Sequence, residues 1–363
     1  MTTVAVDAWC LAGTAAQRGV GTYFRGVLGE LAKDPTIDIV ALAPAGVTLP
    51  SNVRVRRIRR WAPPRWALHE HETRLPWEMR RVPADVYWAP TPDAPRSNPG
   101  PSIQLLHDVI PLTSDDPGLA EERHRFVRYA PRYRAADAVI AVSRFAADEG
   151  IVHLGLDPTR VHVSHLAAGP QFQPREEGPD DPPYLVLVSE WEERKGYREA
   201  FAAIGALAEA GHPHRLRVAG FMAPWKSAQL EAVCAAAPRR DRIDLLGQVD
   251  HKSELPGLLQ GATAFVGASR AEGFGLPALE AMACGTPVVA FSNTSTTEVV
   301  ADGGVLVADG DIDALVAALT RVITEPGWAA ELRERGLRRA ASFSWAKSAA
   351  IHAEIMHSVS RRG

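Results

Sequence analysis

The chain has 363 residues, more than one ordinary hydrophobic core accommodates, and its 46% hydrophobic and 23% charged residues are typical of a globular protein rather than a disordered or fibrous one. The formal net charge of −3 gives no reason to expect nucleic acid as a partner. Cys10, Cys234 and Cys284 are too few for a disulfide framework, and neither an export signal nor a stretch of about 18 apolar residues occurs, so we expect a cytoplasmic protein.

Short apolar runs alternate with helix-length segments along the chain, a pattern typical of parallel sheets covered by helices. The strands expected in the first half are 4–7, 38–42, 53–58, 85–88, 103–106, 138–142 and 161–164. The stretch 173–183 is rich in proline, glycine and acids, so it predicts a linker between an N-terminal domain, 1–172, and a second domain, 184–342.

The same alternation restarts after the linker and ends in a last helix. The strands expected there are 184–188, 216–219, 243–246, 264–266, 288–291 and 305–307, and the helices are 196–210, 226–236, 253–260, 277–284, 311–323 and 328–340, followed by 344–358 behind a Ser344 cap. We therefore predict an α/β fold of two doubly wound, Rossmann-like domains facing a cleft. Ligands of such domains bind at the carboxyl ends of the strands.

Two features follow strands of the first domain. Gly19 and Gly21 lie in an expected loop before a helix from about Thr22; a glycine-hinged lid and a simple helix entrance explain this pair equally well. His107 follows the fifth strand, where it can donate to a developing charge or a sugar hydroxyl. The alternative for His107 is a half-buried histidine held by a backbone carbonyl, and its position slightly favours a functional role.

Arg194 and Lys195 follow the first strand of the second domain, just before a helix. Arginine offers a planar fork for phosphate oxygens and lysine a mobile point charge, so the pair suits a diphosphate. The alternative is a solvated charged turn with Glu192 and Glu193 as local partners.

A glycine-rich turn with two acids follows the strand 264–266. Gly273 and Gly275 allow a tight turn into a helix, whose unpaired N–H groups suit a phosphate. Glu272 and Glu280 are separated by seven residues, and Glu280, expected in the first helical turn, can accept hydrogen bonds from ribose hydroxyls. On these residues alone the blander alternative is favoured, in which Glu280 complements the helix dipole and Glu272 is a solvated loop acid.

Five segments in this order resemble the retaining family-four glycosyltransferases of GT-B architecture, over nearly the whole chain. They are His107-Asp-Val-Ile-Pro-Leu, Val142-Ser-Arg-Phe145, Arg194-Lys-Gly196, Glu272-Gly-Phe-Gly-Leu-Pro-Ala-Leu-Glu280 and Phe343-Ser-Trp345. The resemblance implies that the second domain binds a nucleotide sugar, that the acceptor lies mainly against the first domain, and that the final helix, 343–363, crosses back to the first domain.

The resemblance also implies roles for single residues. Glu280 would hold the donor ribose, Glu272 would contact the transferred sugar, and Arg194 and Lys195 would neutralise the diphosphate so that neither a divalent metal nor a cofactor is needed. The backbone N–H groups of Phe274, Gly275 and Leu276 would join the diphosphate site, His107 would face the sugar, and Gly19, Gly21, Gly273, Ser189 and Glu298 complete the expected donor contacts.

Two places depart from the family pattern or compete with it. Many relatives have Gly-Arg where this chain has Ser189-Glu190, and Arg194 is expected to compensate. The stretch Asp311-Ile-Asp313 fits the metal motif of the other large glycosyltransferase architecture, but it opens a helix after Gly310, which favours a capping role.

A basic stretch, 54–81, bears on the acceptor. Nine arginines face three glutamates there, interleaved with Trp61, Trp66 and Trp77. Such a face can lie on anionic lipid or hold a lipid-diphosphate acceptor. The alternative, a solvated helix whose tryptophans pack inward, is favoured because charge patterns alone are weak indicators.

The sequence thus predicts a retaining, metal-independent glycosyltransferase that moves a hexose-type sugar, GDP-mannose being the first choice of donor, to a hydroxyl of a glycan, a lipid carrier or a natural product. Two other functions stay open. One is a catalytically silent GT-B subunit that binds a nucleotide sugar; the other is a pseudo-glycosyltransferase that couples a nucleotide-linked cyclitol to an amine.

Overall fold

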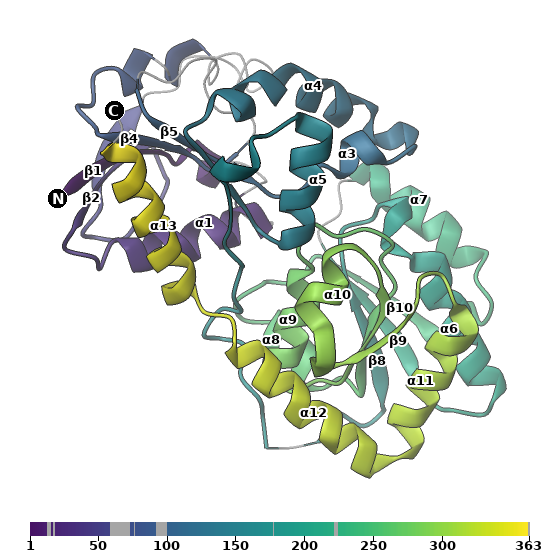
Figure 1. Ribbon diagram of the computed structural model, residues 1–363. Coiled ribbons are helices and arrows are strands. Elements are labelled where there is room, and N and C mark those ends of the chain that lie inside the picture. Colours follow the sequence, from purple (N-terminus) through teal and green to yellow (C-terminus); the bar gives the residue numbers. More distant parts are fainter. Residues whose placement is uncertain are drawn as a thin grey trace. The chain divides into compact units, whose positions relative to one another are not determined.

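The computed structural model describes residues 1–12, 16, 19–58, 73–75, 77–91, 100–176, 178–220 and 224–361, which form two compact units (Figure 1). Unit 1 comprises Met1–Ala167 together with Ser344–Gly363, and unit 2 comprises Ala168–Phe343. The two units are described separately below.

Unit 1 is built on a seven-stranded parallel sheet in the order β3-β2-β1-β4-β5-β6-β7. The strands are β1 (Thr2–Asp7), β2 (Ile37–Pro44), β3 (Arg54–Ile58), β4 (Val86–Ala89), β5 (Ser102–Leu106), β6 (Ala138–Ala141) and β7 (Val161–Val163). The order reverses between β1 and β4, which defines a doubly wound sheet. Every strand expected in this half is confirmed, and most are short, buried apolar runs; the arginine-rich edge strand β3 and the half-buried edge strand β7 are the exceptions.

The helices of unit 1 follow the strands and cover both faces of the sheet (Figure 1). They are α1 (Gly19–Leu31), α3 (Ile110–Thr113), α4 (Ala120–Ala135), α5 (Arg144–Leu154) and α13 (Trp345–Ser360), with 3-10 turns at Trp9–Ala12, Pro117–Leu119 and Pro158–Arg160. The structure corrects the expected loop at Gly19 to Gly21, because α1 already begins at Gly19 and both glycines belong to its first turn.

The last helix, α13, belongs to unit 1, as the sequence predicted, and packs against α1. Ser344 caps it by accepting a hydrogen bond from the Lys347 backbone N–H at 3.2 Å. Its fully buried His352 donates from Nδ1 to the Ser348 carbonyl at 2.8 Å, so Nε2 accepts the Tyr23 hydroxyl at 3.1 Å. Burial lowers the pKa of His352 to about 4, which keeps the ring neutral at neutral pH.

Unit 2 has a six-stranded parallel sheet in the order β10-β9-β8-β11-β12-β13. The strands are β8 (Tyr184–Val188), β9 (Arg215–Ala219), β10 (Ile243–Gly247), β11 (Ala264–Gly267), β12 (Val288–Ser292) and β13 (Val305–Ala308). All of the expected strands of the second half are confirmed. The order reverses between β8 and β11, so this sheet too is doubly wound, and the expected fold class is confirmed.

The helices of unit 2 begin and end within a few residues of the expected positions, except the helix 294–300, which was not predicted. They are α6 (Tyr197–Glu209), α7 (Pro224–Ala235), α8 (Leu255–Gln260), α9 (Leu276–Ala283), α10 (Thr294–Val300), α11 (Ile312–Thr324) and α12 (Pro326–Ala341), with 3-10 turns at Glu193–Lys195, Arg240–Arg242 and Ala301–Gly303. Asp311 caps α11 by accepting from the Ala314 backbone N–H at 2.9 Å, the role favoured for it above.

The stretch expected to be a linker lies against unit 2. Phe172, which was expected to end the first domain, is buried beside this stretch, and its ring meets the ring of His251 edge to face with the centroids 5.2 Å apart. The backbone N–H of Asp180 donates to the Gly261 carbonyl at 2.9 Å. Unit 2 therefore already begins at Ala168, since these contacts attach the stretch to its sheet and helices.

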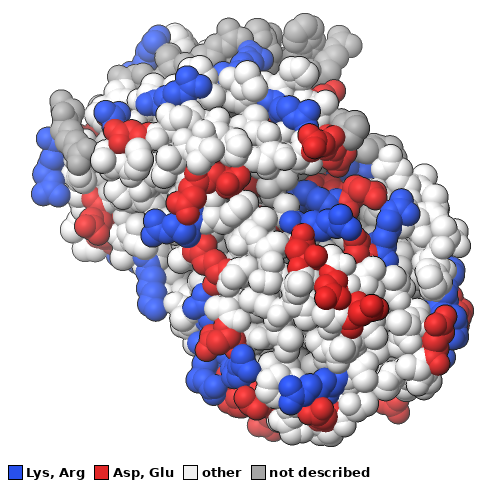
Figure 2. Space-filling view, turned by 45° about the vertical axis from the view of Figure 1, so that its right-hand side comes forward, with Lys and Arg blue, Asp and Glu red and all other residues white. Residues whose placement is uncertain are grey.

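Charged side chains of both signs are interspersed over the face drawn in Figure 2, without a large field of one sign. Among the described residues, no helix is both long and apolar enough to cross a bilayer.

Candidate functional site

The candidate site of unit 2 lies at the carboxyl ends of β8 and β11, where the strand order reverses. The loop after β8 carries Arg194 and Lys195, and the loop after β11 carries Glu272 and leads into α9. Because β8 and β11 are parallel neighbours, two loops that are 77 residues apart in sequence meet at one edge of the sheet. This is where open α/β sheets generally bind ligands.

Lys195 and Glu272 form the central contact of this edge. The Lys195 ammonium donates to both carboxylate oxygens of Glu272, at 2.7 and 2.8 Å. Burial by itself raises the pKa of Glu272, but the charges of Lys195 and Arg194 outweigh it and lower the pKa overall. Glu272 is therefore an ionised, paired carboxylate and not a solvated loop acid.

Arg194 and Gly196 fasten the two loops to each other. The Arg270 backbone N–H donates to the Arg194 carbonyl at 2.8 Å, and the Arg194 guanidinium donates to the Ala271 carbonyl. Gly196 has a φ of +67°, and a Cβ there would lie 1.8 Å from the Ala268 carbonyl oxygen. Only glycine permits this approach, which explains the residue after the cation pair.

The first residues of α10, which follow β12, form hydrogen bonds with the backbone of Glu272. Thr294 Oγ1 accepts from the Glu272 N–H at 3.0 Å, and Ser295 Oγ donates to the Glu272 carbonyl at 2.7 Å. The Asn293 side-chain amide donates to the Ser269 carbonyl at 2.9 Å. Thr294 has a φ of 38°, an unfavourable conformation for a β-branched residue, and such strain concentrates at functional sites.

Glu280 is placed differently from the sequence expectation. It is the fifth residue of α9, so it belongs to the second turn and not the first. Its exposed fraction is 2%, and its place beyond the first turn speaks against the alternative that it only complements the helix dipole. His251 Nε2 donates to Glu280 Oε1 at 2.8 Å, and burial raises the pKa of Glu280, against the opposing effect of His251.

The expected turn into α9 is present. Gly275 stands before the first helical residue with a φ of +87°, the left-handed conformation that favours glycine. The backbone of Phe274, Gly275 and Leu276 therefore leads directly into the helix N-terminus, where N–H groups and the helix dipole favour an anion.

Glu190, the acid at the departure from the family pattern, forms an ion pair that the sequence did not indicate. Lys226, in the first turn of α7, approaches Glu190 Oε1 to 2.9 Å. Arg194, the residue expected to compensate, instead lies with its Nε 2.7 Å from Glu192 Oε2.

In unit 1, His107 is held by a backbone carbonyl, as one of the two alternatives considered for it expected. Its ring donates to the Pro90 carbonyl, and burial lowers its pKa to about 4. Tyr23 contacts the ring edge to face, with the ring centroids 5.8 Å apart. Nε2 of His107 is buried and has no hydrogen-bond partner in the part of the chain that the structure describes. It is a neutral acceptor, suited to a hydroxyl donor.

The remaining expected site residues are spread over both units. Gly19 and Gly21 lie in α1 of unit 1, while Ser189, Gly273 and Glu298 lie in unit 2. The Ser189 hydroxyl donates to the Glu190 carbonyl at 3.0 Å, and the Glu298 carbonyl accepts from Arg339.

The basic stretch 54–81 is described only in part, and Trp61 and Trp66 lie outside the described residues. Trp77 is 47% exposed, with the Arg81 guanidinium 3.1 Å from its ring centroid. Trp77 therefore does not pack inward as the favoured alternative expected.

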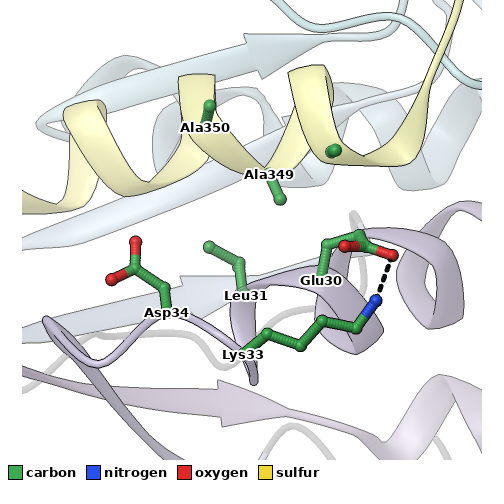
Figure 3. Close-up of a pocket in the computed structure, with 7 residues that line it drawn as sticks. Glu30, Leu31, Lys33, Asp34, Ala349 and Ala350 are labelled. Atoms are coloured by element: carbon green, nitrogen blue, oxygen red, sulfur yellow. Dashed lines mark hydrogen bonds and ion pairs between the residues drawn. The ribbon is translucent and has the colours of Figure 1, made fainter.

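Unit 1 also has a shallow hollow between α1 and α13, with a volume of about 250 Å³ (Figure 3). Leu31 points toward Ala349 there, and Lys33 pairs with Glu30 at 2.7 Å. The hollow is lined by none of the expected site residues and is smaller than typical ligand pockets. No group of acidic, histidine and cysteine residues suited to a metal occurs among the described residues.

Known structures share this architecture. The chain superposes with a TM-score of 0.82 on a sucrose-phosphate synthase from Thermosynechococcus elongatus, with 19% identity and full coverage of both chains. It superposes with a TM-score of 0.74 on WaaG, a glycosyltransferase of lipopolysaccharide biosynthesis, with 17% identity over 97% of this chain and 99% of that one. The fold is thus that of the GT-B glycosyltransferases.

Both parts of the chain match family models. Residues 17–167 match Glycosyltransferase Family 4, and residues 170–340 match Glycosyl transferases group 1. The chain therefore belongs to the family-four glycosyltransferases, as the sequence motifs indicated.

Several curated relatives are mannosyltransferases. O-antigen chain mannosyltransferase B of Escherichia coli is 28% identical over 76% of this chain and 74% of its own length. An MMP alpha-(1->4)-mannosyltransferase of Mycolicibacterium hassiacum is 30% identical over 64% of this chain and 55% of its length. A GDP-mannose-dependent phosphatidylinositol dimannoside mannosyltransferase of Mycobacterium tuberculosis is 35% identical over 41% of this chain and 37% of its length.

Four residues of the site were not found from the sequence: Lys226, His251, Thr294 and Ser295. Thr294 and Ser295 follow the β12 strand end, so the rule that ligands bind at strand ends pointed to their neighbourhood. His251 and Lys226 carried no local signal, because each acts through a carboxylate that is distant in sequence.

Proposed function

We propose that this glycosyltransferase transfers mannose from GDP-mannose to a hydroxyl of a glycan, lipid carrier or natural product, with retention of configuration and without a divalent metal. Mannosyl transfer is the activity named for several relatives, one of which is named as GDP-mannose-dependent. HepE from Anabaena, a fold neighbour with a TM-score of 0.75, was crystallised with UDP and glucose, so the choice of base is tested below.

The observation that carries the proposal is the pairing of Lys195 with Glu272 at the switch point of the second sheet, beside the glycine turn into α9. Lys195 pairs with a residue of the loop that leads into this turn, so an anion at the helix N-terminus would lie near the lysine. In our proposal the donor diphosphate lies against Lys195, Arg194 and the backbone N–H groups of residues 274–276.

The two glutamates would then act on different parts of the donor. Glu280, fixed by His251 through Oε1, has its second carboxylate oxygen to accept from the ribose hydroxyls. Glu272, held by its backbone and by Lys195, would accept from hydroxyls of the transferred sugar. His107 would accept a sugar hydroxyl at Nε2, because its neutral ring donates from the other nitrogen.

In the proposed reaction the bond between the sugar anomeric carbon and the phosphate oxygen breaks, and the electron pair leaves with the diphosphate. Arg194 and Lys195 stabilise the charge that develops on this leaving group, which is commonly the largest catalytic effect. The acceptor oxygen forms its bond on the same face, and its proton passes to the departing phosphate. No protein group is needed as the general base.

The first experiment is a thermal-shift panel of UDP, GDP, dTDP and ADP with their common sugar conjugates, repeated with EDTA. A ligand at ~100 times its dissociation constant stabilises the fold by roughly 2.7 kcal/mol, which is readily seen. We expect GDP and GDP-mannose to stabilise the protein and EDTA to change nothing.

Product analysis by NMR, with a candidate acceptor, then tests the transfer itself. The expected product has the same anomeric configuration as the donor. Stabilisation by another nucleotide would replace GDP-mannose as the donor. Nucleotide binding without glycosylation of any acceptor would favour a silent subunit, and an amine-linked cyclitol product would favour a pseudo-glycosyltransferase.

A further inference from the structure

Three ion pairs join charged side chains at the carboxyl edge of the unit 2 sheet, and Arg194 also lies 4.0 Å from Glu272. Lys195 lies 2.7 Å from Glu272, Arg194 lies 2.7 Å from Glu192, and Lys226 lies 2.9 Å from Glu190. These three cations and three carboxylates sum to no net charge. A diphosphate is strongly anionic. A site with no net charge therefore binds it only if the cations donate hydrogen bonds to phosphate oxygens as well as to the carboxylates.

Lys226 reaches this edge from a different strand than the two expected cations. It stands in the first turn of α7, which follows β9, and β9 is the parallel neighbour of β8. The Trp191 indole N–H donates to the Gln229 side-chain carbonyl at 3.1 Å, which ties the loop of Glu190 to α7. The Trp191–Gln229 hydrogen bond therefore holds the two segments that carry Glu190 and Lys226 next to each other.

The pair is shielded but accessible. The Lys226 side chain is 16% exposed and that of Glu190 is 14% exposed, so their charges are screened less than those of surface pairs. The Lys226 ammonium contacts Oε1 of Glu190. An ammonium group offers three N–H donors, a number that allows bonds to a carboxylate and to a phosphate oxygen at the same time.

From this geometry we infer that Lys226 is a third cation of the donor diphosphate site, which Glu190 holds in place. The inference rests on the proposed nucleotide-sugar donor. Without Lys226, the three glutamates of this edge would outnumber Arg194 and Lys195 and would repel the diphosphate. Glu190 orients Lys226 and moderates its charge, so that the nucleotide product is released more readily than from a fully cationic site.

The opposing explanation is that Lys226 serves only to neutralise Glu190 and never meets the phosphates. The two explanations differ for a double variant. If Lys226 only neutralises Glu190, then replacing both residues with neutral ones restores the affinity for a nucleoside diphosphate. If Lys226 contacts the phosphates, the affinity stays low even when Glu190 is neutral.

The test is calorimetric binding of GDP and of guanosine to the wild type and to Lys226→Met, Glu190→Gln and the double variant. We expect Lys226→Met and the double variant to lose GDP affinity by roughly tenfold to a hundredfold, the effect of one charge-assisted hydrogen bond. Guanosine affinity should stay unchanged in all of them, and Glu190→Gln should bind GDP as tightly as the wild type or more tightly. The double variant leaves no unpaired charge, so it also answers the question if Lys226→Met fails to fold.

Arg198→Met is the matched control, since Arg198 and Glu193 form a 3.0 Å pair on the same segment with both side chains 59% exposed. It should bind GDP like the wild type. A double variant within about twofold of the wild type in GDP affinity would overturn the inference. Equal losses for GDP and guanosine would overturn it as well. If the wild type binds no nucleoside diphosphate at all, the proposed donor site itself fails.

Discussion

The two glutamates of the 272–280 stretch have opposite environments although only seven residues separate them. Glu272 sits in a loop, its carboxylate bridged by Lys195 and its pKa lowered on balance. Glu280 sits in the second turn of α9, is 2% exposed, contacts His251 and has a raised pKa. One acid is stabilised as an anion, whereas burial makes the anionic form of the other less favourable.

This difference indicates a division of labour. Acids whose surroundings move their pKa values apart generally have different tasks. Glu272 is part of a network of charges and is braced by α10, which suits a group near the reacting bond. Glu280 is a buried acceptor with one oxygen fixed, which suits recognition of neutral hydroxyls.

Replacing Glu272 by alanine should give the largest effect. We expect turnover to fall by roughly 10²–10³-fold, as for removal of other preorganised polar groups of an active site, while nucleotide affinity is kept or increased because Lys195 loses its partner. Steady-state kinetics and calorimetry on the same preparation would check this. If Glu272→Ala weakened nucleotide binding and spared turnover, the roles assigned to the two acids would be reversed.

Replacing Glu280 by alanine should give the next largest effect, and this effect should be on nucleotide affinity and not on turnover. The loss of charge-assisted bonds to the ribose should weaken nucleotide affinity by roughly tenfold to a hundredfold. Turnover at saturating donor should change little. The 2′,3′-dideoxy nucleotide is the matched probe, because its affinity should be the same for the wild type and for Glu280→Ala.

Replacing Thr294 tests whether its hydrogen bond with the Glu272 backbone affects turnover without affecting nucleotide affinity. Thr294→Val keeps the shape but removes the acceptor for the Glu272 N–H, so we expect turnover to drop by roughly two- to tenfold with unchanged nucleotide affinity. Thr294→Ser keeps the acceptor and should stay close to the wild type. Equal losses in the two variants would show that the hydroxyl has no part in positioning Glu272.

Glutamine in place of Glu272 and glutamine in place of Glu280 should change the free energy of unfolding in opposite directions, each by roughly 1 kcal/mol or less. The melting temperature should shift accordingly. Glu280→Gln should stabilise the protein at pH values above the raised pKa of Glu280, since it removes a buried charge there, and this gain should vanish as the pH falls through that pKa to the pKa of the unfolded chain. Glu272→Gln should destabilise it, since the contribution of Glu272 exists above the pKa of the unfolded chain and is lost as the pH falls through its lowered pKa. The check is to compare melting curves of both variants with those of the wild type from pH 7 down to pH 4. Shifts of the same sign for the two variants would contradict the assignment of opposite environments to the two acids.

The sequence predicted the strands, most helices and the edge of the sheet where the charged residues gather, because apolar runs and turn residues are local signals. It did not predict which side chains contact the two glutamates Glu280 and Glu190. Glu280 is the fifth and not the fourth residue of its helix, since α9 begins at Leu276, one residue earlier than expected. His251 lies on a loop whose path depends on tertiary packing. Lys226 could not be assigned to Glu190, because that contact depends on β9 lying beside β8.

The place of α13 has a consequence for the order in which the chain is made. Unit 2 is one continuous stretch, so it can fold once residue 343 has left the ribosome, whereas unit 1 must wait for α13. Until then Tyr23 lacks the His352 side chain that covers it in the folded protein. The unit whose synthesis starts first is thus completed last, and a ribosome that stalls before α13 releases a chain in which only unit 2 can be whole.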